Sequence, residues 1–150
     1  MEIERKFLVN LSDLPFDPKA YPSRKIEQAY LCTAPVVRIR RDNDDFFLTY
    51  KSKGLMVREE YNLPLTEKSY DHLLQKADGR VITKTRYVIP IENNLSVELD
   101  IFEGDLSPLV LAEIEFPDEA LAKTYQAPAW LGEEVTNSAK YHNSTLSQKD

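Results

Sequence analysis

The chain has 150 residues, of which 42% are hydrophobic, so it is long enough for one domain with a buried core. Its formal net charge of −6 argues against nonspecific binding to the backbone of DNA or RNA, although a local basic cluster can still bind a small anion. Cys32 is the single cysteine, which excludes an intrachain disulfide and a cysteine-based zinc site.

The N-terminus and the hydropathy of the chain bear on its location. The sequence starts with Met-Glu-Ile-Glu, which is acidic where a secretory signal peptide would be basic. No apolar run has the length that a membrane-spanning helix needs. We therefore expect a cytoplasmic protein, one domain over residues 1–150, and no nucleic-acid or membrane partner. A monomer and a homodimer are both compatible with the sequence.

Polar and apolar residues alternate in five segments of the first half of the chain, as they do in strands with one buried face. The predicted strands are Glu2–Val9, Lys25–Cys32, Val36–Arg41, Phe46–Lys51 and Met56–Leu63. The acidic run 42–45 indicates a turn, so the third and fourth strands should form a hairpin.

A helix and three further strands are predicted in the second half. Thr66 is a suitable N-cap for a helix over residues 66–77, in which apolar residues recur at helical spacing. The further strands are Arg80–Ile89, Leu95–Phe102 and Leu109–Phe116. We also expect a short helix after Asp118 and a polar terminal helix over Asn137–Gln148.

These elements predict an α+β fold that is mainly β. The sequence contains no repeated strand–helix–strand units, so an antiparallel sheet is the natural architecture. Eight strands can close into a barrel with an interior just wide enough for side chains or one small ligand. A few helices would flank this barrel.

One face of the predicted strands is charged, and the other is aliphatic or aromatic. The charged face carries seven bases, namely Lys6, Arg38, Arg40, Lys51, Arg58, Lys84 and Arg86. It also carries seven acids, namely Glu2, Glu4, Glu60, Glu98, Asp100, Glu113 and Glu115. This face could simply be solvated, or it could line the interior of the barrel.

The distribution of the two signs favours a charged interior. The acids gather on the first and the last two strands, whereas most of the bases lie on the strands between them. Arginine suits bidentate contacts with phosphate oxygens, and carboxylates suit Mg²⁺ or Mn²⁺. Bases that face acids across a tunnel are what a complex of polyphosphate with about two divalent ions would require.

The series of motifs resembles the CYTH superfamily, the triphosphate tunnel metalloenzymes, over nearly the whole chain. The segment Glu2-Ile3-Glu4-Arg5-Lys6 fits the ExExK signature of that family at the N-terminus. The other matching segments are Arg38–Arg40, Lys51–Ser52, Arg58–Tyr61, Lys84–Tyr87, Glu98–Asp100, Glu113–Phe116, Leu131–Thr136 and Lys140–Tyr141. The resemblance implies an eight-stranded antiparallel tunnel.

The resemblance also implies a reaction, the metal-dependent hydrolysis of inorganic tripolyphosphate to pyrophosphate and phosphate. The seven bases would bind phosphate oxygens. The carboxylates Glu2, Glu4, Asp100, Glu113 and Glu115 would hold two Mg²⁺ or Mn²⁺ ions, and Glu60 and Glu98 would bind metal or orient bases. The candidate catalytic residues are Glu2, Glu4, Lys84 and Tyr30.

Other functions remain open on the sequence. An adenylate cyclase of the class IV type would need an adenine pocket, and a thiamine triphosphatase would need an aromatic platform, for which Trp130 is the one tryptophan. A polyphosphate-binding module without turnover would not need the metal-binding acids. We expect His72 and His142 to be solvated and to take no part in catalysis.

Overall fold

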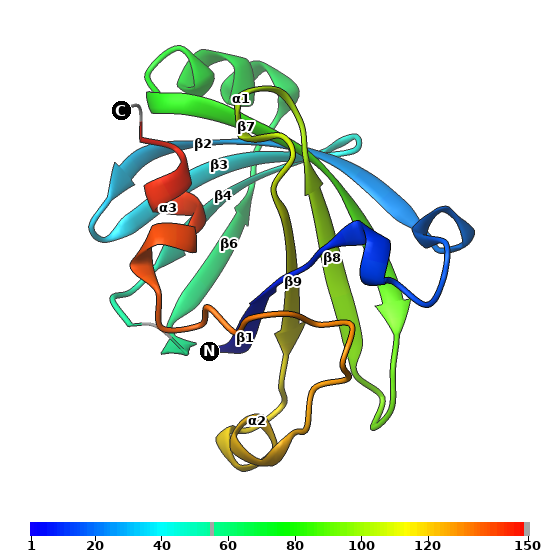
Figure 1. Ribbon diagram of the computed structural model, residues 1–150. Coiled ribbons are helices and arrows are strands. Elements are labelled where there is room, and N and C mark those ends of the chain that lie inside the picture. Colours follow the sequence, from blue (N-terminus) through cyan, green and yellow to red (C-terminus); the bar gives the residue numbers. More distant parts are fainter. Residues whose placement is uncertain (55, 149–150) are drawn as a thin grey trace.

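A computed structural model describes residues 1–54 and 56–148 and contains one antiparallel sheet that curls into a barrel (Figure 1). Its strands are β1 (Glu2–Leu8), β2 (Ser23–Thr33), β3 (Val36–Asp42), β4 (Asp45–Lys51), β5 (Val57–Arg58), β6 (Glu60–Pro64), β7 (Asp78–Pro90), β8 (Ser96–Phe102) and β9 (Val110–Glu115). They are ordered β5-β1-β9-β8-β7-β2-β3-β4-β6. The mainly β, antiparallel barrel predicted from the sequence is confirmed.

The barrel closes through the segment that was expected to be a single strand over Met56–Leu63. Its first part, β5, pairs with β1, and its second part, β6, pairs with β4. The pairing changes at Glu59, whose N–H donates to the Ser52 hydroxyl at 2.9 Å and whose carbonyl accepts from the Ser52 N–H at 3.0 Å. The predicted eight strands are therefore nine in the described residues, because one strand changes partners to join the two ends of the sheet.

The helices cover the outside of the barrel. Helix α1 (Glu67–Leu74) begins with a capping box between Thr66 and Ser69, and its Tyr70 packs against Ala29 and Ile39 on the outer face of β2 and β3. Helix α2 (Glu119–Thr124) is capped by Asp118, which accepts from the Leu121 N–H at 2.7 Å. Both predicted helices are confirmed.

Single turns of 3₁₀ helix connect several strands and precede the last helix. They are η1 (Leu11–Asp13), η2 (Pro18–Ala20), η3 (Gly104–Leu106) and η4 (Ala139–Tyr141). The expected terminal helix over Asn137–Gln148 is shorter than predicted, since η4 is followed by α3 (Asn143–Leu146). His142 lies between them with extended backbone (φ −67°, ψ 139°), which breaks the helix at that residue.

The main hydrophobic core lies on the outer face of β1, β8 and β9. Residues that alternate with the charged positions pack there against α2 and the segment around Leu131, among them Ile3, Phe7, Val97, Leu99 and Ile114. Burial of this face fixes the register, because a slip of one residue would exchange the two faces of a strand. The charged face is thereby directed inward. Within the described residues, no helix has both the length and the apolar character required to cross a membrane.

One end of the barrel interior is apolar. Ile82, Phe102 and Leu111 continue the inward-facing rows of β7, β8 and β9, and they belong to one buried cluster. Tyr141 and Leu146 of the C-terminal segment pack against this cluster. The Arg80 N–H donates to the Ser147 carbonyl at 2.6 Å, which ties the segment to the start of β7. The C-terminal segment therefore covers this end of the barrel.

Candidate functional site

A polar cavity of about 170 Å³ lies inside the barrel. It is lined by Glu2, Glu4, Lys6, Tyr30, Val36, Arg38, Arg40, Lys51, Arg58, Glu60, Arg86, Glu98, Glu113, Glu115, His142, Asn143 and Ser144. All the residues that the sequence placed on a charged inner face line this cavity, except Lys84 and Asp100. The choice of the charged face as the interior is therefore correct.

Four carboxylates form one wall of the cavity, called here the acidic wall: Glu4, Glu98, Glu113 and Glu115. Glu4 lies opposite Glu115 across β1 and β9, and Glu98 lies opposite Glu113 across β8 and β9. Like charges directly opposite one another destabilise a sheet. Burial raises the pKa of Glu4 to about 8, and the negative charges of Glu113 and Glu2 contribute to the same shift. The nearest base recorded for Glu4 is Arg58, at 4.0 Å. Glu4 is therefore short of positive charge, whereas Glu98 lies 3.2 Å from Arg86 and Glu113 lies 3.6 Å from Lys6.

Arg38 and Arg40 on β3, called here the arginine pair, have the opposite deficit. Arg40 donates to the neutral Gln28 amide oxygen at 2.9 and 2.5 Å, so its orientation is fixed while its charge is not neutralised. Burial, together with Arg38 and Arg86, lowers the pKa of Arg40 to about 9. Arg38 is only 4% exposed and donates to the Thr49 hydroxyl at 3.3 Å. The arginine pair is therefore short of negative charge.

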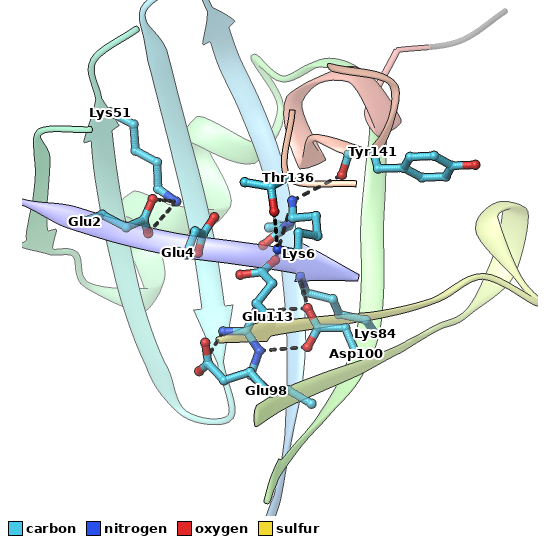
Figure 2. A network of polar contacts seen from close by, with 12 residues as sticks. Glu2, Glu4, Lys6, Lys51, Lys84, Glu98, Asp100, Glu113, Thr136 and Tyr141 are labelled. Atoms are coloured by element: carbon cyan, nitrogen blue, oxygen red, sulfur yellow. Dashed lines mark hydrogen bonds and ion pairs between the residues drawn. The ribbon is translucent and has the colours of Figure 1, made fainter. Parts of the chain in front are cut away.

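The strand order places these two groups opposite one another. With β5 and β6 counted as one position, β3 lies four strands from β9 in either direction around the barrel. The cavity between them thus has a wall suited to cations and a wall suited to anions. Between these walls, Lys51 joins Glu2 at 3.0 Å and Glu60 at 3.5 Å, as Figure 2 shows for Glu2. The charges are paired at this junction.

Lys84 and Asp100 are buried and do not line the cavity, so they lie behind its wall. Figure 2 shows the contact between them. The Asp100 carboxylate accepts from Arg86 at 2.7 and 2.9 Å, and it also lies 2.7 Å from the Lys84 ammonium. Both carboxylate oxygens of Asp100 are thus occupied by bases. Burial lowers the pKa of Lys84 to about 7, and the positive charges of Arg86 and Arg40 contribute to the same shift. The negative charge of Asp100 acts in the opposite direction and raises the pKa.

The carboxylates fit divalent cations by their chemistry. Hard oxygen donors with incomplete charge compensation are what Mg²⁺ and Mn²⁺ bind. In residues 1–54 and 56–148, no three His, Cys, Asp or Glu side chains are gathered closely enough to be a ready-made metal site. The fit therefore rests on the four acids of the acidic wall and on the unbalanced charge of Glu4, and metal binding would require these side chains to move closer together.

The crowded acids predict how stability depends on pH in EDTA. Glu4 has a pKa of about 8 in the folded chain against 4.5 for a free glutamate, so the folded state binds more protons between these values. The contribution of Glu4 to the free energy of unfolding therefore falls as the pH rises from about 5 to about 8. We expect the wild type to lose at least about 1 kcal/mol over this window relative to Glu4→Gln, measured by urea unfolding.

The comparison with Glu4→Gln isolates this effect, because Lys84 and His142 titrate in both proteins. Addition of Mg²⁺ is expected to reduce the difference, since a bound cation would favour the ionised carboxylates. Parallel stability curves for the two proteins in EDTA would show that Glu4 is not electrostatically strained.

The C-terminal segment supplies cavity residues that the sequence analysis did not identify. His142, Asn143 and Ser144 line the cavity, so the expectation that His142 is solvated was wrong. Residues 132–135 run beside β1, where the Val135 N–H donates to the Lys6 carbonyl at 2.8 Å. This pairing directs the following residues back over the barrel end. His72 is exposed on α1, as expected. Tyr30 lines the cavity and is 2% exposed.

Comparisons with known proteins agree with this fold. An inorganic triphosphatase from Nitrosomonas europaea is 37% identical over 148 residues, covering 97% of this chain and 95% of that protein. An inorganic triphosphatase from Acetivibrio thermocellus is 37% identical over 152 residues, covering 97% of this chain and 92% of that protein. The crystal structure of the inorganic triphosphatase NE1496 superposes with a TM-score of 0.73 at 35% identity, covering 100% of this chain and 96% of that one. Residues 1–149 match the CYTH domain, and the chain therefore belongs to the CYTH domain family.

Proposed function

We propose that this chain hydrolyses inorganic tripolyphosphate to pyrophosphate and phosphate inside the barrel, with the aid of divalent metal ions. The observation that carries the proposal is uncompensated charge on opposite sides of the cavity, acidic at Glu4 beside Glu115 and basic at the arginine pair on β3. A polyphosphate chain with bound divalent cations would compensate both walls at once. The similarity to two inorganic triphosphatases at 37% identity supports the same reaction.

The acids are assigned to the metal and the bases to the phosphates. Glu2, Glu4, Glu98, Glu113 and Glu115 would hold the ions, Mg²⁺ or Mn²⁺, and Glu60 and Asp100 remain candidates. A bound divalent ion supplies charge neutralisation at phosphate oxygens and lowers the pKa of a coordinated water. Arg38 and Arg40 would bind and orient the phosphates, joined by Lys6, Lys51, Arg58 and Arg86.

Lys84 and Tyr30 are the proposed groups that move or hold protons. A pKa of about 7 suits Lys84 as a proton acceptor at neutral pH. Its ammonium group now contacts Asp100 at 2.7 Å, so this role requires that Lys84 exchange that contact for one inside the cavity. Tyr30 faces the cavity and could donate its hydroxyl to a terminal phosphate.

Arg38→Ala is expected to raise KM for tripolyphosphate by about 10- to 100-fold, because a charge-assisted hydrogen bond to phosphate would be lost. Steady-state kinetics at saturating Mg²⁺ measure the effect. The matched control is Arg41→Ala, since Arg41 lies on the same strand but is exposed outside the cavity. An unchanged KM for Arg38→Ala would remove Arg38 from the phosphate site.

The composition of the cavity wall disfavours the alternatives. Among the described lining residues Tyr30 and His142 carry the only aromatic rings, and none is Phe or Trp, so the wall offers little stacking surface for adenine or thiamine. Trp130 packs edge-on against Phe16, with ring centroids 5.1 Å apart, in the outer core and not in the cavity. A competition assay with ATP and thiamine triphosphate, with cyclic AMP monitored, would test both alternatives directly.

We further propose that the enzyme acts in the cytoplasm on a free small-molecule triphosphate, without nucleic-acid or membrane partners. The acidic net charge of −6 supports this. The chain would form one functional domain, as a monomer or homodimer. Light scattering of the purified protein would give its oligomeric state.

A further inference from the structure

His142 reaches the cavity from a segment far from the strands in sequence. It joins η4 to α3, where its N–H donates to the Ala139 carbonyl at 3.2 Å and its carbonyl accepts from the Leu146 N–H at 2.9 Å. Its imidazole is half-buried and lines the same cavity as the arginine pair. The backbone is thus fixed on both sides of a side chain that faces the proposed substrate space.

The surroundings of the imidazole are basic. Lys6 donates to the carbonyl of the adjacent Tyr141 at 3.2 Å, a contact that Figure 2 shows, and Lys6 and Arg58 line the cavity beside His142. Burial lowers the pKa of His142 to about 4, and the positive charges of Lys6 and Arg58 contribute to the same shift. A hydrogen bond to the Thr136 backbone acts in the opposite direction and raises the pKa. At neutral pH the ring is therefore uncharged, and its one N–H has the Thr136 carbonyl as an acceptor in a region that already holds two cations.

We propose that His142 is a substrate-binding residue, which exchanges its hydrogen bond to the Thr136 backbone for one in which the imidazole N–H donates to a phosphoryl oxygen of the triphosphate, at the end of the cavity covered by the C-terminal segment. The inference rests on the proposed function and extends it from the strands to this segment. A chain of phosphates that contacts Lys6 and Arg58 would also meet the His142 ring, because all three line one cavity of about 170 Å³ and both bases lie close enough to lower the pKa of the imidazole. Through this contact, substrate binding would hold the C-terminal segment in place.

Nuclear magnetic resonance gives a direct test, because the chain has two histidines. The imidazole nitrogen signals of ¹⁵N-labelled protein would be recorded with Mg²⁺, with and without diimidotriphosphate, whose P–N–P bridges resist cleavage. The variant His72→Asn assigns the two sets of signals. We expect the His142 signals to shift on addition of the analogue and the signals of exposed His72 to stay unchanged.

Kinetics provide the second test. His142→Ala is expected to raise KM for tripolyphosphate by about tenfold and to change kcat by less than about threefold, as for the loss of one hydrogen bond to a charged group. His142→Gln retains an N–H donor and should restore most of the affinity. His72→Ala is the matched control. If His142 served only to pack the segment, Gln would not rescue KM.

The possible failures are distinguishable. If calorimetry detects no binding of diimidotriphosphate with Mg²⁺, the proposed function and this inference are both wrong. If the analogue binds while the His142 signals stay unmoved, only the inference is wrong. A KM for His142→Ala equal to that of the wild type would overturn it as well.

Discussion

Glu4→Gln is expected to abolish metal-dependent cleavage of tripolyphosphate while the fold remains intact. Glu4 belongs to the acidic wall, opposite Glu115, and its nearest recorded base is 4.0 Å away. Glutamine keeps the shape but lacks the negative charge that a divalent ion requires. We expect kcat to fall by about 1,000-fold, equivalent to ~4 kcal/mol of transition-state stabilisation.

The stability of the same variant separates this role from a structural one. Because burial and neighbouring carboxylates disfavour the ionised form of Glu4, a neutral amide should leave the melting temperature at pH 8 unchanged or raise it. Glu133→Gln, an exposed substitution outside the cavity, is the matched control for activity. Retained turnover in Glu4→Gln, or loss of activity through unfolding, would contradict the assignment.

Asp100→Asn is expected to have its largest effect on stability. The Asp100 carboxylate is 1% exposed and compensates two buried bases, Arg86 and Lys84, at distances of 2.7 Å. Its replacement leaves both bases without their principal anion in the interior. Removal of one partner from a buried ion pair typically costs about 3–5 kcal/mol, and we expect a loss of that order in urea unfolding in EDTA.

A matched control shows whether the main role of Asp100 is structural or metal-binding. Asp105→Asn, at an exposed position in η3, should unfold like the wild type and serves as the control. If Asp100→Asn were as stable as the wild type and lost only metal-dependent activity, Asp100 would act chiefly as a metal ligand. The geometry instead makes Asp100 the anchor that holds Arg86 at the cavity wall.

The alternation of residues along the strands was enough to predict the charged interior. In a strand, sequence parity determines the face of each side chain, so Glu2, Glu4 and Lys6 had to lie together once Ile3 and Phe7 were buried outside. The position of a residue in this alternation does not determine whether its side chain lines the cavity or lies behind the wall. That Lys84 and Asp100 lie behind the wall depends on the contacts of Asp100 with both Lys84 and Arg86 across β7 and β8, which no single strand reveals.

Two further features depended on contacts between distant segments. The break of the fifth predicted strand at Glu59 arises because the barrel closes there, with β1 on one side and β4 on the other. The position of His142 follows from the pairing of residues 132–135 with β1 and from the packing of Tyr141 in the barrel end. The polar composition of that segment gave no sign of either contact, and only the resemblance over Leu131–Thr136 and Lys140–Tyr141 indicated that the segment has a role in the family.

The central claim is tested most directly by phosphate release from tripolyphosphate, with ATP and thiamine triphosphate assayed in parallel, in Mg²⁺, Mn²⁺ or EDTA. The account predicts rapid release from tripolyphosphate that requires a divalent ion, with much slower turnover of the two organic triphosphates. Release of cyclic AMP from ATP, or tight binding of tripolyphosphate without any cleavage in either metal, would contradict the proposed hydrolysis.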